Sequence, residues 1–373
     1  MPPTPPGPFL TLGEGPRVIV YHQTHHLSDS SQPVSLLPLI TNNTGITHVI
    51  IAAFHLNDPP GNITLNNDHP DHEKFQTLWA EVAWLQASGV KVLGMLGGAA
   101  KGSFERLDGH DLQRFESYYV PLRDSIRAHN FDGLDLDVEE NMSLDGTIRL
   151  IDRLRTDFGS SFLITLAPVA TALLPLQPHL SGFSYSSLER HRGDQIAWYN
   201  TQFYCGWGDA STTFWYDAIL ASGWKAQKVV MGLITNPALG AGYVPWEKME
   251  GVLRTLRSRY PSFGGVMGWE YFCALPDGEE RPWEWVELMA GVLRTQMQVE
   301  HAPAASAVPV THKRPPTMVT PFGTTAMPPP QHPFPAENVS ALQDLGFSQQ
   351  QAVAALNMTD GNVEQAAGLL FAD

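Results

Sequence analysis

Cysteine and basic residues are both scarce in this sequence. Two cysteines, Cys205 and Cys273, occur among 373 residues, which is too few for a disulfide framework. The 38 acidic residues outnumber the 23 lysines and arginines and give a net charge of -15. An acidic surface repels phosphate backbones, so nucleic acid is not an expected partner.

Long apolar runs and targeting signals are also missing. No stretch approaches the roughly 18 apolar residues of a membrane-spanning helix, so no membrane partner is expected. The stretch from Met1 to Pro16 is rich in proline and glycine, and it lacks the basic patch and apolar run of a secretory signal. We therefore expect a cytoplasmic, or alternatively nuclear, location. Hydrophobic residues make up 43% of the chain, which is enough for a sizeable core.

Short β-branched runs alternate with amphipathic helical stretches through most of the chain. Apolar residues recur at helical spacing in 75–85 and 112–126, where they share one helical face. The alternation predicts parallel βαβ units, and eight repeats predict an α/β fold of the closed (β/α)8 TIM-barrel type. The rival open doubly wound sheet would need a Gly-x-Gly-x-x-Gly after its first strand, which is lacking. The predicted strands are 17–21, 47–54, 91–96, 131–139, 162–168, 196–204, 228–233 and 264–270.

Two composition changes divide the chain into three predicted parts. Residues 1–300 form the barrel domain. Residues 301–335 contain ten prolines and only two charged residues, Lys313 and Arg314, which predicts an extended linker. In residues 336–373 apolar positions recur at helical spacing between two Gly-containing breaks, which predicts a small domain of three short helices.

Three acids at alternate positions mark the segment 131–140, which reads Phe-Asp-Gly-Leu-Asp-Leu-Asp-Val-Glu-Glu. Residues two apart on a strand share a face, so Asp135, Asp137 and Glu139 would project into the barrel together. Stacked acids repel one another and lose solvation, so at least one should hold a proton near neutrality. Such a proton is useful in catalysis, and Glu139 would lie at the C-terminal mouth, where barrel enzymes place their chemistry.

Two other interpretations of the three acids stay open from the residues alone. Aspartate and leucine could alternate harmlessly on an exposed edge strand, although both flanks are strongly apolar. The carboxylates could also bind a metal ion, with His22, His25 or His55 as further ligands.

The segment resembles Asp-x-x-Asp-x-Asp-x-Glu, the fourth-strand signature of glycoside hydrolase family 18. That family includes chitinases and endo-β-N-acetylglucosaminidases. The resemblance covers about residues 17–300, and it implies a TIM barrel that needs no cofactor and no metal. Further residues of this sequence resemble landmarks of the family at other strands. They are Tyr21, Phe54, Gly97-Gly98, Gln202-Phe203-Tyr204 and Gly265-Val266-Met267-Gly268-Trp269.

The resemblance implies a role for each acid. Glu139 would protonate the glycosidic oxygen, while the substrate's own N-acetyl oxygen attacks the anomeric carbon, which predicts retention of configuration. Asp137 would orient that acetamide, and Asp135 would share a proton with Asp137. Tyr204 would donate a hydrogen bond to the acetamide carbonyl, and Asp132 would be structural. The implied substrate-binding residues are Tyr21, Phe54, Gly98, Gln202 and Trp269, the last stacking under the sugar.

Two positions depart from the family pattern. The third-strand Ser-x-Gly-Gly of the family reads Met95-Leu96-Gly97-Gly98 here, and a methionine cannot make the serine's hydrogen bond to the acids. The sixth-strand motif usually continues with Asp or Asn, but Cys205 stands there, and a thiol is a weak hydrogen-bonding group. Both changes leave Glu139 in place and put sugar affinity in question.

Three functions compete at this point. The first is a chitinase-like hydrolase acting on β-1,4-linked N-acetylglucosamine in chitin or its oligomers. The second is an endo-β-N-acetylglucosaminidase that cleaves the chitobiose core of N-glycans, which the motif does not separate from the first. The third is a catalytically silent lectin, although inactive relatives usually lack the glutamate that is present at Glu139.

The last 38 residues resemble a ubiquitin-associated (UBA) domain, a three-helix module. The resemblance rests on Leu345-Gly346-Phe347, Ala355-Leu356 and Gly361-Asn362-Val363-Glu364-x-Ala366. It implies ubiquitin as a partner; the alternative is that these apolar residues only close the small core. The implied ubiquitin-binding residues are Leu345, Gly346, Phe347, Leu369 and Leu370.

Overall fold

The computed structural model of the protein describes residues 15–27, 32–175, 177 and 179–294, together with 338, 339, 353 and 356. The chain divides into two compact units, Met1–Met297 and Gln298–Asp373. The four described residues of the second unit are helical, and Val339 and Leu356 among them are buried. The predicted ubiquitin-binding residues Leu345, Gly346, Phe347, Leu369 and Leu370 lie outside the described residues, as does the predicted linker.

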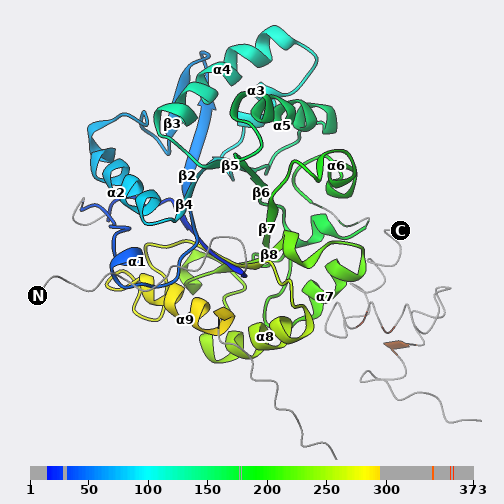
Figure 1. Ribbon diagram of the computed structural model, residues 1–373. Helices are drawn as coiled ribbons and strands as arrows, with labels where there is room; N and C mark the ends of the chain where they lie inside the picture. The colour runs from blue at the N-terminus through cyan, green and yellow to red at the C-terminus, as the bar shows by residue number, and fades with distance from the viewer. Residues whose placement is uncertain are drawn as a thin grey trace, which may run out of the picture. The chain divides into compact units, whose positions relative to one another are not determined.

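The first unit is a closed barrel of parallel strands, which confirms the predicted TIM barrel (Figure 1). The strands neighbour one another in the order β1-β9-β8-β7-β6-β5-β4-β2, and a further pairing between β1 and β2 closes the ring. The barrel strands are β1 Arg17–His22, β2 His48–Asn57, β4 Lys91–Gly97, β5 Gly133–Asp137, β6 Leu163–Leu166, β7 Trp198–Gln202, β8 Val229–Ile234 and β9 Gly265–Trp269.

One strand was not predicted from the sequence. β3 (Asn62–Leu65) pairs antiparallel with the last four residues of β2, from Phe54 opposite Leu65 to Asn57 opposite Asn62. The hairpin continues β2 beyond its parallel pairing with β4, which shifts register between Ile51 and Phe54. β2 and β3 therefore form a wall above the C-terminal mouth of the barrel.

Helices surround the strands as an outer ring (Figure 1). Local capping explains several of their starts: the Asp111 side chain accepts hydrogen bonds from the first backbone N–H groups of α4, and the Ser143 hydroxyl does the same for α5. Within the described ranges, no helix has the length and apolar character needed to cross a membrane. The helices are α1 Pro38–Thr41, α2 Gln76–Ala87, α3 Ser103–Leu107, α4 Leu112–Ala128, α5 Leu144–Phe158, α6 Tyr185–Arg192, α7 Phe214–Ala221, α8 Trp246–Arg259 and α9 Trp283–Arg294, with short 3-10 turns at η1 Glu73–Phe75, η2 Ala170–Leu173, η3 Ala226–Lys228 and η4 Pro237–Leu239.

Apolar side chains form two separate cores. The larger lies between strands and helices and includes Leu134 and Leu136 of β5. The smaller is made of strand residues that face the barrel interior, among them Tyr21, Met95 and Trp198. Because strand side chains alternate between the two cores, every second residue of β5 must point into the interior, where Asp135 and Asp137 lie.

Candidate active site

Three acids line the centre of the barrel mouth in order of increasing exposure. Asp135 is fully buried and Asp137 is 6% exposed, whereas Glu139 is only partly buried. β5 ends at Asp137, so the predicted extension of this strand to Glu139 is wrong by two residues. The backbone N–H of Glu139 instead donates to the Asp137 carbonyl at 3.2 Å, and this local turn holds Glu139 at the rim above the other two acids.

Asp135 is held by three hydrogen-bond donors from three different strands. Its carboxylate accepts from the Tyr21 hydroxyl at 2.6 Å, the Thr165 hydroxyl at 2.5 Å and the Asn200 amide at 3.0 Å. Burial raises the pKa of Asp135, and these three hydrogen bonds oppose that rise. The result is a buried carboxyl group that accepts three hydrogen bonds and whose position is fixed.

Asp137 and Glu139 share one amide group. The side-chain nitrogen of Gln202 lies 3.2 Å from Asp137 Oδ1 and 3.3 Å from Glu139 Oε1, and it also donates to the Ala167 carbonyl at 3.0 Å. Burial, followed by the charges of Glu139 and Asp135, raises the pKa of Asp137 well above its usual range. Burial also raises the pKa of Glu139, against the opposing hydrogen bond from Gln202. The pair therefore retains a proton more readily than free carboxyls do, as a proton donor at a glycosidic oxygen requires.

Two aromatic side chains complete the centre. Tyr204 follows β7 and is 8% exposed; burial and then the Asp137 charge raise the pKa of its hydroxyl, so Tyr204 stays a protonated donor. Trp269 ends β9, is partly exposed, and packs against Tyr21 with ring centroids 5.6 Å apart. A partly exposed indole beside the acids offers a surface on which the apolar face of a sugar could lie.

Gly98 lies against the acids because it has no side chain. Its backbone N–H donates to the Asp137 carbonyl at 2.9 Å, and its φ is +90°. A Cβ at this position would lie 3.0 Å from Met95 Cε and 3.6 Å from Asp137 Oδ2. Glycine therefore permits both the left-handed backbone and the close approach of the loop after β4.

Phe54 is the one predicted substrate-binding residue that the structure places away from the centre. Its ring is 2% exposed and packs edge-on against Phe131, with centroids 5.6 Å apart, and near His129. The register shift between Ile51 and Phe54 turns this side chain toward the helices. The structure thus gives Phe54 a packing position beside Phe131, whereas the neighbouring His55 lines a polar cavity.

Several residues of the centre were not singled out from the sequence. Thr165 and Asn200 both donate to Asp135, and the Trp198 indole N–H donates to Asn200 Oδ1 at 2.9 Å. The sequence of β7 carried a signal for two of them. Trp198 and Asn200 alternate with Gln202 along the strand, so they share the face that carries the Gln202 side chain.

The two departures from the family pattern have different surroundings. Met95 is 1% exposed, pairs in register with Asp135 and belongs to the interior core. Cys205 is exposed with φ +55°, and its backbone N–H donates to the Ala241 carbonyl at 2.9 Å. Met95 therefore fills space beside the acids, whereas Cys205 is at the surface of the loop after β7.

Glu140 and Asp132 are engaged in structural contacts. The Glu140 carboxylate accepts from the backbone N–H groups of Gly102 and Phe104, both at 2.8 Å, and so ties the start of α3 to the end of β5. Asp132 accepts from Lys91 Nζ at 2.7 Å and from the Val92 backbone N–H at 2.9 Å, which fits the predicted structural role.

The histidines named as possible metal ligands do not gather around the acids. The rings of His22 and His25 pack against each other with centroids 4.8 Å apart, and the latter ring hydrogen-bonds the Ala52 carbonyl at 3.0 Å. No three His, Cys, Asp or Glu side chains of the described ranges form a group with metal-ligand geometry.

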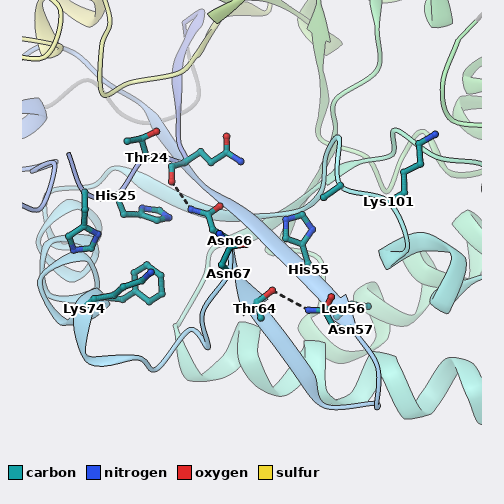
Figure 2. Close-up of a pocket in the computed structure, with 14 residues that line it drawn as sticks. Thr24, His25, His55, Leu56, Asn57, Thr64, Asn66, Asn67, Lys74 and Lys101 are labelled. Carbon is teal, nitrogen blue, oxygen red and sulfur yellow. Dashed lines mark hydrogen bonds between the residues drawn. The ribbon is translucent and has the colours of Figure 1, made fainter. Parts of the chain in front are cut away.

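A polar cavity of about 780 Å³ lies over the C-terminal ends of β1, β2 and β4 (Figure 2). Its walls come from the loop after β1, the β2–β3 hairpin, η1 and the loop after β4. The last of these runs from Gly98, whose backbone N–H donates to the Asp137 carbonyl, to the lining residues Ala100 and Lys101. The lining residues are Gln23, Thr24, His25, His26, His55, Leu56, Asn57, Thr64, Asn66, Asn67, Lys74, Phe75, Ala100 and Lys101.

Comparison with known protein families decides the assignment of the barrel. The sequence profile of glycosyl hydrolases family 18 matches residues 17–241, which is more than half of the chain. The chain belongs to this family. The family 18 barrel is followed by a second match, to the UBA/TS-N domain, over residues 334–370.

Individual relatives agree with this assignment. The family 18 barrel is similar to the solved structure of a chitinase, ChiC, from Aspergillus fumigatus, with 58% identity, a TM-score of 0.68, and coverage of 74% of this chain and 98% of that chain. It is also similar to a fungal endo-beta-N-acetylglucosaminidase of the same family, with 50% identity, a TM-score of 0.72, and coverage of 75% and 98%. Chitinase 2 of Rhizopus oligosporus is 30% identical over 51% of this chain, a match that spans 36% of that relative.

Proposed function

We propose that the barrel hydrolyses β-1,4-linked N-acetylglucosamine bonds in chitin-like chains, with Glu139 as the general acid. The observation that carries this proposal is the shared amide of Gln202, which joins Glu139 and Asp137 at 3.3 and 3.2 Å. Because burial raises the pKa of both carboxyls, one proton can reside on the pair and be delivered from Glu139, the more exposed member.

The other residues of the centre support a substrate-assisted reaction. In this scheme the N-acetyl oxygen of the substrate attacks the anomeric carbon as Glu139 protonates the leaving oxygen. Asp137 stabilises the positive charge that develops on the acetamide, and the Tyr204 hydroxyl donates to its carbonyl. Asp135, fixed by its three donors, is among the charges that raise the pKa of Asp137 and so favours a proton on Asp137.

Product stereochemistry tests this mechanism. Proton NMR of the first minutes of hydrolysis of an N-acetylglucosamine oligomer distinguishes the two anomers of the new reducing end. We expect the β-anomer first, with later mutarotation to the equilibrium mixture. If the α-anomer appears first, the reaction inverts configuration and the acetamide is not the nucleophile.

A second candidate function is cleavage within the chitobiose core of N-glycans. The observation that favours it is the 50% identity, over 75% of this chain, to a structure described as an endo-beta-N-acetylglucosaminidase. The same acids serve either substrate. Incubation with a high-mannose glycopeptide, followed by mass spectrometry, tests it; a peptide product that retains one N-acetylglucosamine supports this function, and intact glycopeptide contradicts it.

We propose that the C-terminal segment binds ubiquitin, because residues 334–370 match the UBA/TS-N domain. A ubiquitin reader would also suit an intracellular location, which imaging of a fluorescently tagged full chain tests directly. For binding itself, isotope-labelled ubiquitin is titrated with the full chain and with Phe347→Ala. Shifts in the ubiquitin spectrum that weaken with Phe347→Ala support the proposal, and an unchanged spectrum contradicts it.

A further inference from the structure

One buried carboxylate at the end of β9 takes no part in the proposed reaction. Glu270 directly follows Trp269, the last residue of β9, and is 4% exposed. Its carboxylate accepts hydrogen bonds from the backbone N–H groups of Gln23 and Thr24 at 3.0 and 2.8 Å, and from the Thr24 hydroxyl at 2.9 Å. Because a buried carboxylate is costly without such partners, Glu270 and the loop after β1 hold each other in place.

The backbone on either side of Glu270 is fixed by two neighbouring strands. Thr235, which follows β8 and is fully buried, donates its hydroxyl to the Glu270 carbonyl at 2.6 Å and its backbone N–H to the Trp269 carbonyl at 2.8 Å. The Tyr271 backbone N–H donates to the Tyr21 carbonyl of β1 at 2.9 Å. The segment that follows Trp269 is therefore tied to β8 and β1 by its backbone and to the loop after β1 by the Glu270 side chain.

The loop that binds Glu270 is itself anchored on its other side. Asn66, which follows β3, donates through its side-chain nitrogen to the Gln23 carbonyl at 2.9 Å and accepts from the Ala53 backbone N–H of β2 at 3.2 Å (Figure 2). The partners of Glu270 are thus supported by a barrel strand. A side chain whose partners are locked in this way can fix the position of its neighbour.

Trp269 is the neighbour whose position matters for the substrate. Its indole is partly exposed and packs on the Tyr21 ring with centroids 5.6 Å apart. The Tyr21 hydroxyl is bound to Asp135 at 2.6 Å, so the Tyr21 ring cannot follow the indole if the backbone of Trp269 moves. Stacking of a sugar on an aromatic ring depends on where that ring lies, and a displacement of the indole would weaken it.

We propose that Glu270 is a positioning residue for the hydrolysis, which holds the Trp269 indole in place under the sugar by binding the loop after β1. The inference rests on the proposed function, in which the substrate lies against Trp269. Within the described ranges, each hydrogen bond of the Glu270 carboxylate ends on Gln23 or Thr24 and none on Asp137 or Glu139. Glu270 therefore acts through Trp269 and not on the proton donor.

A double-mutant cycle with Trp269 tests this role on an N-acetylglucosamine tetramer. Glu270→Ala should raise KM about fivefold to tenfold, as for loss of one aromatic stacking contact, and keep kcat within about twofold of wild type. In the Trp269→Ala background the same substitution should change KM less than about twofold, because the two residues act as one unit. Glu270→Gln should keep KM within about threefold of wild type, since its amide can still accept from the two backbone N–H groups and donate to the Thr24 hydroxyl.

The matched control is Glu81→Ala. Glu81 of α2 is 7% exposed, and its carboxylate binds another part of the same loop, accepting from the Leu36 backbone N–H at 2.6 Å and the Ser35 hydroxyl at 2.8 Å. This variant should lower the melting temperature and leave KM unchanged. If Glu270→Ala does not fold, Thr24→Val replaces it in the cycle, because that change removes one donor to Glu270 and leaves the carboxylate in place.

The outcomes separate this role from the proposed hydrolysis. A rise in KM that is lost in the Trp269→Ala background and largely reversed by Glu270→Gln supports the positioning role. If wild type cleaves the tetramer but KM is unchanged in Glu270→Ala, rises equally with and without Trp269, or rises as much in Glu81→Ala, the positioning role is refuted and the hydrolase stands. If wild type leaves the tetramer intact, the proposed hydrolysis has failed and the positioning role fails with it.

Discussion

Replacing Tyr21 by phenylalanine removes one donor from the most deeply buried acid and leaves the aromatic ring in place. The Tyr21 hydroxyl donates to Asp135 Oδ2 at 2.6 Å, and the two side chains are 1% and 0% exposed. A hydrogen bond to a charged group contributes about 1.5–3 kcal/mol, and one between neutral groups about 0.5–1.5 kcal/mol. We expect Tyr21→Phe to lower the free energy of unfolding by about 2 kcal/mol where Asp135 is ionised.

The size of this loss should depend on pH with a definite sign. Burial raises the pKa of Asp135 above that of the unfolded chain, and loss of the Tyr21 donor raises it further. A group with a raised folded pKa contributes stability that is fully present below the unfolded pKa and is lost as pH rises through the folded pKa. The variant should therefore differ least from wild type in acidic buffer and most in mildly alkaline buffer.

Urea unfolding followed by tryptophan fluorescence in both buffers measures the difference. The matched control is Tyr216→Phe, because the fully buried Tyr216 hydroxyl donates to the neutral carbonyls of Ala226 and Val229 at 3.1 and 3.0 Å. That variant should lose about 1 kcal/mol in either buffer. Equal losses for Tyr21→Phe in the two buffers would refute the assignment of a charged acceptor at Asp135.

Three further substitutions probe the acids and the space beside them. Asp137→Asn should raise the melting temperature near neutrality, because burial and the neighbouring acids raise the pKa of Asp137 and ionisation of this buried group opposes folding. Turnover should fall about 100- to 1,000-fold. Calorimetry measures the melting temperature, and a hydrolysis assay measures the turnover. Gln202→Ala removes the hydrogen bond that lowers the pKa of Glu139, so the alkaline limb of the kcat/KM profile should move to higher pH; a limb that moves to lower pH contradicts this. Met95→Ser should lower the free energy of unfolding by about 2–4 kcal/mol, because Met95 is buried in the barrel interior; unchanged urea midpoints would exclude a packing role.

The barrel was predictable from the sequence because each strand carries its own apolar pattern. All eight predicted strands exist, with ends that differ by a few residues. The acids were found because period-two alternation fixes which side of β5 they share. The hairpin strand β3 (Asn62–Leu65) was missed because its four residues are short and polar on one side, so no apolar run marked it.

Prediction from the sequence failed where tertiary packing decides which way a side chain points. Phe54 turns toward Phe131 because the pairing of β2 with β4 shifts register just before it, and that shift has no local signal. Asn200 and Thr165 became visible only as donors to Asp135, since their importance depends on strands that meet across the barrel. The cavity likewise combines four segments that are separate in the chain.

The most direct test of the central claim compares substitution of two adjacent glutamates on a labelled N-acetylglucosamine oligomer. Gln keeps the shape of the side chain and removes the transferable proton, so Glu139→Gln should lose about 100- to 10,000-fold in kcat/KM. Glu140→Gln should retain most activity, because the Glu140 carboxylate is engaged by the backbone of α3. If Glu139→Gln remains active, Glu139 is not the proton donor and the proposed mechanism is wrong.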